Sequence, residues 1–305
     1  MELNAVIPIA MQTTDQFISY WLKAAYLTLS KEMLIVFGSA IALVLILRAV
    51  AQAQQFTTGV LFDTGQWLLK ITLIGVLLKS WPLVDEFVVG TWVRGSETLA
   101  TQLVTSISRS SAKSLQGILQ QSLMNSFGLA NDLLKSGTFT HPTPWLAALL
   151  VLLFSFAASA FTAFEIIVSK LSMALLIALM PLFLVFKCFK ATEGLFDQWL
   201  GQLTGNALVI VFVSISGVMG MMLLNYAIPH QEAILTFESA MSVVLMSSIS
   251  LGLIMASVNM ARHIGHAVST TSSAAQLGQH MGMAARLGKI PFNGISRAHR
   301  MIKRG

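Results

Sequence analysis

The sequence predicts an all-α, polytopic membrane protein. The chain is 55% hydrophobic and only 10% charged, whereas a soluble domain carries about 25% charged residues. It also contains five uncharged stretches, and three of them reach the length needed to cross a bilayer, which is about 20 residues for a helix. The stretches are 33–47, 145–164, 171–186, 198–231 and 239–261. A soluble globular protein would not need such runs, so this class is excluded.

The N-terminal part of the chain divides into an amphipathic segment and two membrane helices. In residues 1–32, apolar side chains such as Phe17 and Trp21 recur at helical spacing. The first two membrane helices follow within 33–84. The second of them carries Lys70, which is a candidate intramembrane cation. The alternative is that the long lysine side chain simply reaches the membrane interface.

Residues 85–144 form a central extramembrane segment with amphipathic helices that are too polar to span a bilayer. Two apolar faces at helical spacing define these helices. The first face consists of Leu99, Leu103 and Ile107, and the second of Leu115, Ile118, Leu119 and Leu123. We expect both helices to pack against each other, against a lipid surface or against neighbouring subunits.

The remaining chain consists of a membrane core, 145–261, and a basic tail, 262–305. The tail holds seven Lys and Arg residues and no Asp or Glu, so the positive-inside rule places it in the cytoplasm. The number of crossings depends on 171–186. A full crossing of this run gives six spans, and a broken or re-entrant helix gives five. The loop charges favour six, whereas the short run and its interruption by Pro181 favour five, so the residues leave both open.

The stretch around Pro181 is the main candidate site. Proline has no amide hydrogen and its ring clashes with the preceding turn, so it kinks or breaks a helix. Such a break is tolerated at membrane depth where protein or a water-lined cavity surrounds it. After the break, Phe196, Trp199, Leu200 and Leu203 recur at helical spacing. This stripe predicts an interfacial helix over 192–204.

The stretch ALMPLFLVFKCFKATEGLFDQWLGQLTGNAL, residues 178–208, resembles the signature of polytopic inner-membrane subunits of bacterial type IV secretion systems, the TrbL/VirB-six family. Those proteins carry an A-x-x-P-[LI]-F run, a short basic spacer with a threonine, and an L-F-x-x-W-[LI] helix. The residues that carry the match are Ala178, Pro181, Leu182, Phe183, Thr192, Leu195, Phe196, Trp199 and Leu200. Outside this stretch the similarity is one of length, hydropathy and layout.

The resemblance implies a structural and conduit subunit of the inner-membrane complex that moves DNA or protein and supports pilus assembly. It also implies five spans, with 171–186 broken or re-entrant, and a periplasmic central region at 85–144. The expected partners are further copies of the chain, the pilin, the minor pilin of the stalk and an ATPase. The residues expected to serve structure and assembly are Pro181, Leu182, Phe183, Thr192, Phe196, Trp199 and Leu200.

The sequence predicts no enzymatic activity and no cofactor. It lacks the G-x-x-x-x-G-K-[ST] phosphate-binding loop, so energy would come from a partner ATPase or the membrane gradient. His263 and His266 share one helical face, but a metal site would need further ligands nearby. The basic tail suits anionic phospholipid headgroups, an acidic patch on the ATPase, or transient contact with translocating DNA.

Two other function classes are weighed against this interpretation. A secondary transporter or channel could bind its substrate at the Pro181 break, although such proteins usually show paired broken helices in two related halves. An intramembrane enzyme would need a catalytic pairing of side chains within the spans, and the sequence does not suggest one.

Overall fold

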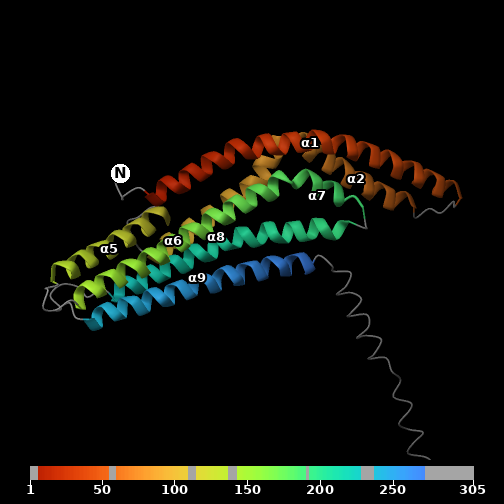
Figure 1. Cartoon of the computed structure of the whole chain (residues 1–305). Coiled ribbons are helices and arrows are strands. Elements are labelled where there is room, and N and C mark those ends of the chain that lie inside the picture. The colour runs from red at the N-terminus through yellow and green to blue at the C-terminus, as the bar shows by residue number, and fades with distance from the viewer. Residues whose placement is uncertain are drawn as a thin grey trace, which may run out of the picture.

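The computed structural model describes residues 6–54, 60–108, 115–136, 143–189, 192–227 and 237–271. Throughout this part of the chain the elements are helices and none is a strand, which confirms the all-α prediction (Figure 1). The helices are α1 (Val6–Gln54), α2 (Val60–Lys79), α3 (Trp81–Leu83), the π-helical segment η2 (Val84–Arg94), α4 (Gly95–Ser108), α5 (Leu115–Ser136), α6 (Thr143–Ala178), α7 (Met180–Phe186), α8 (Glu193–Ala227) and α9 (Phe237–Thr271).

Among the described residues, four helices are long and apolar enough to cross a membrane. They are Pro8–Leu47, Pro144–Ala178, Glu193–Leu223 and Val244–Ala267. A fifth span results if Trp67–Lys79 and Trp81–Ile107, which meet at a bend of 97°, count as one broken span. The prediction of a polytopic membrane protein is therefore confirmed.

The structure divides the apolar runs differently from the sequence-based expectation. The run 171–186 is not a separate helix, because its first eight residues complete α6 and the remainder forms α7 beyond a turn at Leu179. Likewise, the expected interfacial helix 192–204 is not a separate element, because it forms the first part of α8. There is no proline in 145–178 or in 192–227, so α6 and α8 continue through the boundaries that we expected at 164 and 204.

The long helices lie side by side in one elongated bundle (Figure 1). α6, α8 and α9 pack against one another, and α1 crosses α6 and α7 on the opposite side from α9. The helix α1 is continuous through residue 32, so the expected amphipathic segment and the first membrane helix form one element. Buried side chains form two clusters, one at each end of the bundle.

Small residues allow close packing between α8 and α9. A Cβ atom added at Gly265 of α9 would collide with the backbone of Gly205 and Gly201 of α8. Further along the same pair, a Cβ atom at Gly220 would collide with Ser250. In a membrane protein such close backbone approach replaces the hydrophobic driving force between helices.

The second membrane helix ends earlier than the predicted boundary at residue 84. The helix α2 stops at Lys79, because Ser80 adopts an extended conformation and acts as the N-cap of the next helix, which has Pro82 in its first turn. Hydroxyl groups of α1 satisfy the carbonyls at this end. Tyr26 donates to the Leu77 oxygen at 2.9 Å, and Ser30 donates to the Leu78 oxygen.

The amphipathic helices of the central segment are present as α4 and α5. On α4, the apolar face predicted from Leu99, Leu103 and Ile107 is exposed in the single chain. Ser96, Ala100 and Val104 are buried instead. The smaller side chains therefore face the bundle, and the larger ones remain free to pack on another surface. The predicted face on α5 consists of Leu115, Ile118, Leu119 and Leu123, and these side chains lie outside the part of the chain that the structure describes.

Candidate functional site

Pro181 stands at the break between α6 and α7. Because proline lacks an amide hydrogen, the carbonyl of Ile177, four residues earlier, has no helical donor. The amide of Leu182 donates to the Leu179 oxygen at 3.1 Å, which is one residue closer than in an α-helix. Pro181 itself is buried. The break thus interrupts the regular backbone hydrogen bonds at the end of α6, at a place that is buried.

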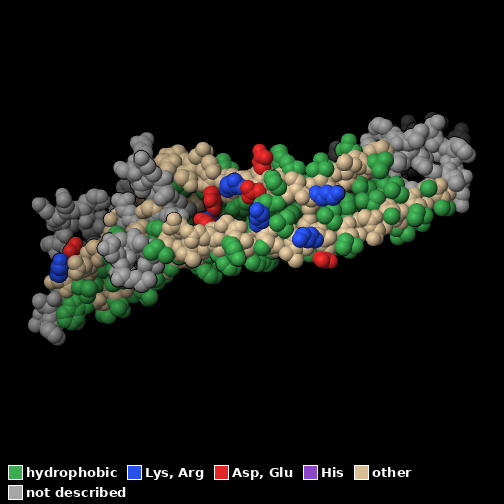
Figure 2. All heavy atoms as spheres, turned by 90° about the horizontal axis from the view of Figure 1, so that it is seen from above, with side chains coloured by type: hydrophobic (Ala, Val, Ile, Leu, Met, Phe, Trp, Pro, Cys, Tyr) green, Lys and Arg blue, Asp and Glu red, His purple; other side chains and the backbone are tan. Residues whose placement is uncertain are grey.

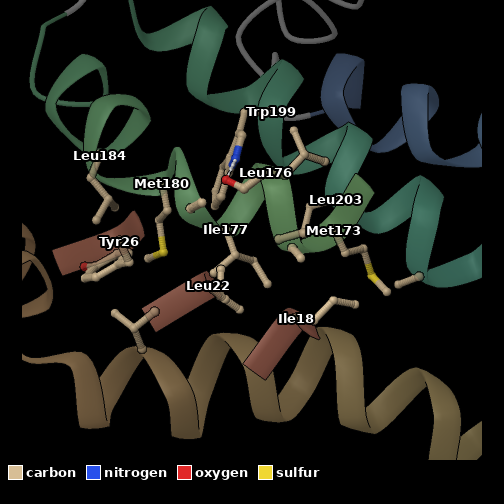
Figure 3. Packing of buried hydrophobic residues seen from close by; sticks show 14 of the residues in the cluster. Ile18, Leu22, Tyr26, Met173, Leu176, Ile177, Met180, Leu184, Trp199 and Leu203 are labelled. Atoms are coloured by element: carbon tan, nitrogen blue, oxygen red, sulfur yellow. Dashed lines mark hydrogen bonds between the residues drawn. The ribbon is translucent and has the colours of Figure 1, made fainter. Parts of the chain in front are cut away.

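Trp199 of α8 supplies a side-chain donor at this break. Its indole nitrogen donates to the Leu176 carbonyl oxygen at 2.9 Å, and its side chain is 4% exposed (Figure 3). The bond joins the first turns of α8 to the last turn of α6. A hydrogen bond of this kind contributes roughly 0.5–1.5 kcal/mol, so the indole helps to hold α8 against the last turn of α6.

Aromatic rings surround the Trp199 indole. Phe183 of α7 stacks on it with ring centroids 5.8 Å apart, and Phe196 of α8 lies 5.3 Å from it. Phe186 meets Phe183 edge to face at 6.0 Å. We call Leu176, Pro181, Phe183, Phe196 and Trp199 the Pro181 junction. Its residues come from three helices and close the break on the α8 side.

Charged and polar groups complete the turn between α7 and α8. Lys187 pairs with Glu193 at 2.7 Å and with Asp197 at 3.1 Å, and its ammonium lies 5.3 Å from the Phe196 ring centre. Partial burial lowers the pKa of Lys187, but hydrogen bonds to the two carboxylates outweigh it and leave that pKa raised. Thr192 donates its hydroxyl to the Phe186 oxygen at 2.8 Å, which caps the end of α7.

The other predicted residues have different surroundings. Leu182 and Leu200 are half-buried beside the junction. Lys70 is exposed on α2, and within the described part of the chain no carboxylate forms an ion pair with it. His263 and His266 are exposed on α9. Among the described residues there is no group of three or more potential metal ligands. The basic tail beyond Thr271 lies outside the described residues.

Two interhelical ion-pair clusters were not predicted from the sequence. Lys170 of α6 is buried and binds Asp15 of α1 at 2.8 Å and Glu97 of α4 at 2.6 Å. Glu165 of α6 pairs with Arg262 of α9 at 3.3 Å. Charged side chains also gather across the middle of the face in Figure 2, with hydrophobic side chains on both sides. The sequence offered one indication of these pairs, because Glu165 and Lys170 are charged residues between the apolar runs 145–164 and 171–186.

Comparison with known proteins gives one family. The model of the TrbL/VirB6 plasmid conjugal transfer protein matches residues 9–257. This range contains the whole Pro181 junction and the four candidate spans, apart from Pro8 and residues 258–267 of the last span. The comparison with curated proteins finds no match.

Proposed function

Since the chain belongs to the TrbL/VirB6 plasmid conjugal transfer family, we propose that it is a structural and conduit subunit of the inner-membrane complex of a type IV secretion or conjugation system. It supports translocation of DNA or protein and assembly of the pilus, and it has no enzymatic activity of its own. The observation that carries the proposal is the family match over residues 9–257.

The geometry supports a scaffolding role for the Pro181 junction. Trp199 ties α8 to α6 through a buried hydrogen bond, and the Lys187 cluster closes the turn between α7 and α8. Together these contacts hold a break in a membrane helix in one arrangement. A subunit that assembles into a larger complex needs such a fixed shape, because its contact surfaces must keep their relative positions.

The partners of this proposal are further copies of the chain, the pilin, the minor pilin of the stalk and a partner ATPase. Exposed apolar side chains on α4, including Leu99 and Leu103, offer a surface for a protein partner. The C-terminus lies in the cytoplasm by the positive-inside rule, where its seven basic residues from Arg262 onward can meet phospholipid headgroups, the ATPase or translocating DNA. The central segment 85–144 is then periplasmic.

A transporter with a polar substrate site at the Pro181 break is less well supported. Trp199 and Phe183 fill the α8 side of the break. On the α1 side, the residues beside the break are mainly apolar. The polar side chains on the α1 side are Trp21, Thr28 and Glu32, which are few for a site that orients a small hydrophilic substrate through several convergent polar groups.

Trp199 variants test the proposal. Trp199→Ala removes the stacking and the hydrogen bond, and we expect normal membrane insertion but at least tenfold less assembled complex and DNA transfer. Trp199→Phe keeps an aromatic ring without the donor, and we expect an intermediate loss. Phe156→Ala is the matched control, because Phe156 is 56% exposed on α6.

The measurements are membrane fractionation, complex recovery on native gels and conjugation frequency. Recovery of the Trp199→Ala complex at the wild-type level would contradict the scaffolding role of the junction. Normal DNA transfer by cells that lack the chain altogether would contradict the proposed function itself.

A further inference from the structure

A groove lies between α1 and the end of α6, on the opposite side of the helix break from Trp199. Its volume is about 530 Å³, within the usual range for small-molecule sites, roughly 300–1,000 Å³. The lining residues from α1 are Trp21, Ala24, Ala25, Thr28, Leu29 and Glu32, and those from the end of α6 and the turn after it are Leu175, Ala178 and Leu179. The small side chains make the groove hollow, and the large ones form its walls.

The groove has the length and surroundings of a lipid tail site. Its α1 residues run from Trp21 to Glu32, which corresponds to about 17 Å along the helix. This is close to half of a bilayer hydrocarbon core, which is about 30 Å thick. The two walls belong to helices that are candidate spans, Pro8–Leu47 and Pro144–Ala178.

The polar side chains of the groove are Trp21, Thr28 and Glu32. The Thr28 hydroxyl already donates to the Ala24 oxygen at 2.9 Å, and the Glu32 carboxylate is an acceptor. Glu32 lies at one end and is exposed, and no Lys or Arg in the described part of the chain forms an ion pair with it. Because the Leu182 amide donates to Leu179, the carbonyl of the groove residue Ala178 loses its helical donor. Acceptors beside an apolar channel call for a ligand that combines a donor with a hydrocarbon chain.

The charge pattern selects the headgroup. An unpaired carboxylate on a membrane helix is costly and favours a cationic partner. Lys31, the residue before Glu32, is exposed on the same helix turn and presents the opposite charge. A headgroup with one ammonium and one phosphate matches this pair. We propose that the groove binds one acyl chain of an aminophospholipid, with the primary ammonium at Glu32 and the phosphate near Lys31.

The site differs from general coating by lipid because it is specific for both shape and headgroup. A primary ammonium donates hydrogen bonds to a carboxylate, whereas the quaternary ammonium of phosphatidylcholine carries charge without a donor. Phosphatidylglycerol provides neutral hydroxyl donors but no positive charge. The predicted order of occupancy is therefore phosphatidylethanolamine, then phosphatidylcholine, then phosphatidylglycerol, at equal acyl composition.

Photocrosslinking of the full chain in vesicles tests this order. Each of the three lipids carries the same diazirine in one acyl chain, and labelled peptides are mapped by mass spectrometry. We expect phosphatidylethanolamine to label the peptides of α1 residues 21–32 and α6 residues 175–179 about tenfold more than phosphatidylglycerol does.

Variants separate shape from charge. Ala24→Phe places a ring in the groove from an exposed position, and we expect at least fivefold less labelling there. Thr28→Phe fills the same space from a second exposed position in case the first variant does not fold. Ala42→Phe, exposed on α1 outside the groove, is the matched control. Glu32→Gln keeps the shape and should reduce the preference for phosphatidylethanolamine about tenfold.

Three results would overturn the proposal. The first is equal labelling by the three lipids. The second is labelling that Ala24→Phe and Thr28→Phe leave unchanged while both proteins elute as the wild type does. The third is labelling that disappears when the chain is assembled with the other subunits of the secretion system, which would assign the groove to a protein partner.

Discussion

Lys170, Asp15 and Glu97 form an ion-pair cluster. We predict that removing the charges of its two carboxylates destabilises the chain more than removing the charge of the lysine. The Lys170 side chain is 5% exposed, whereas those of Asp15 and Glu97 are 45% and 36% exposed. The double variant Asp15→Asn/Glu97→Gln leaves a buried ammonium without a counter-charge. Breaking a buried pair in this way costs about 3–5 kcal/mol. We expect this variant to be the least stable of the series.

Lys170→Met has the opposite electrostatic consequence and a smaller cost. It leaves two carboxylates that are accessible enough for water or headgroups to solvate, so we expect a loss of about 1–2 kcal/mol. Combining all three substitutions removes every charge of the cluster. The triple variant should therefore recover more than half of the stability that the double variant loses, since no buried charge remains unpaired.

The assay is unfolding of the purified chain by titration with sodium dodecyl sulfate in a mild detergent, followed by circular dichroism. Glu86→Gln serves as the control, because Glu86 is exposed on η2 and forms no ion pair among the described residues. Two results would refute the reasoning: a larger loss for Lys170→Met than for the double variant, or no recovery in the triple variant.

Three further predictions concern packing, thiol reactivity and topology. Gly265→Ala should separate α8 from α9 and destabilise the chain by about 1–3 kcal/mol, whereas Gly252→Ala, where a Cβ atom meets nothing within 4 Å, should be neutral or slightly stabilising in the same titration. Burial raises the pKa of the Cys188 thiol to about 11, so its alkylation should be slow at pH 7 to 9 and should accelerate as the pH rises towards that value; fast labelling at neutral pH would contradict this. In a chain with Cys188→Ser, a membrane-impermeant maleimide applied to intact cells should label a cysteine placed at Ser108 but not one at Ser272, and protection of both positions would contradict a periplasmic central segment.

The sequence was most informative where the determining interactions are local. Proline chemistry alone locates the break beside Pro181, because the missing amide acts within one helical turn. The helical spacing of Phe196 and Trp199 likewise places both rings on one side of α8, and the structure has both at the junction. Hydropathy identifies the long apolar helices for the same reason, since composition over about 20 residues decides whether a segment can cross a bilayer.

The sequence was least informative where residues far apart in the chain decide the outcome. One of the two partners of Lys170 is Asp15, 155 positions away, and no local pattern connects them. On α4, spacing identifies Leu99 and Leu103 as an apolar face but does not say whether this face turns toward its own bundle. Where Gly205 of α8 meets Gly265 of α9, the two backbones are in direct contact and no bulky apolar side chains lie between them.

The length of α1 limits how the molecule can sit in a bilayer. Its 49 residues correspond to a rod of about 74 Å, more than twice the thickness of a hydrocarbon core of about 30 Å. Even at a tilt of about 40°, the upper end of the usual range, the rod would span about 57 Å along the membrane normal. Part of α1 must therefore lie outside the hydrocarbon core. Since α1 contributes Met11 to one buried cluster and Tyr26 to the other, this single continuous helix mechanically connects the two clusters.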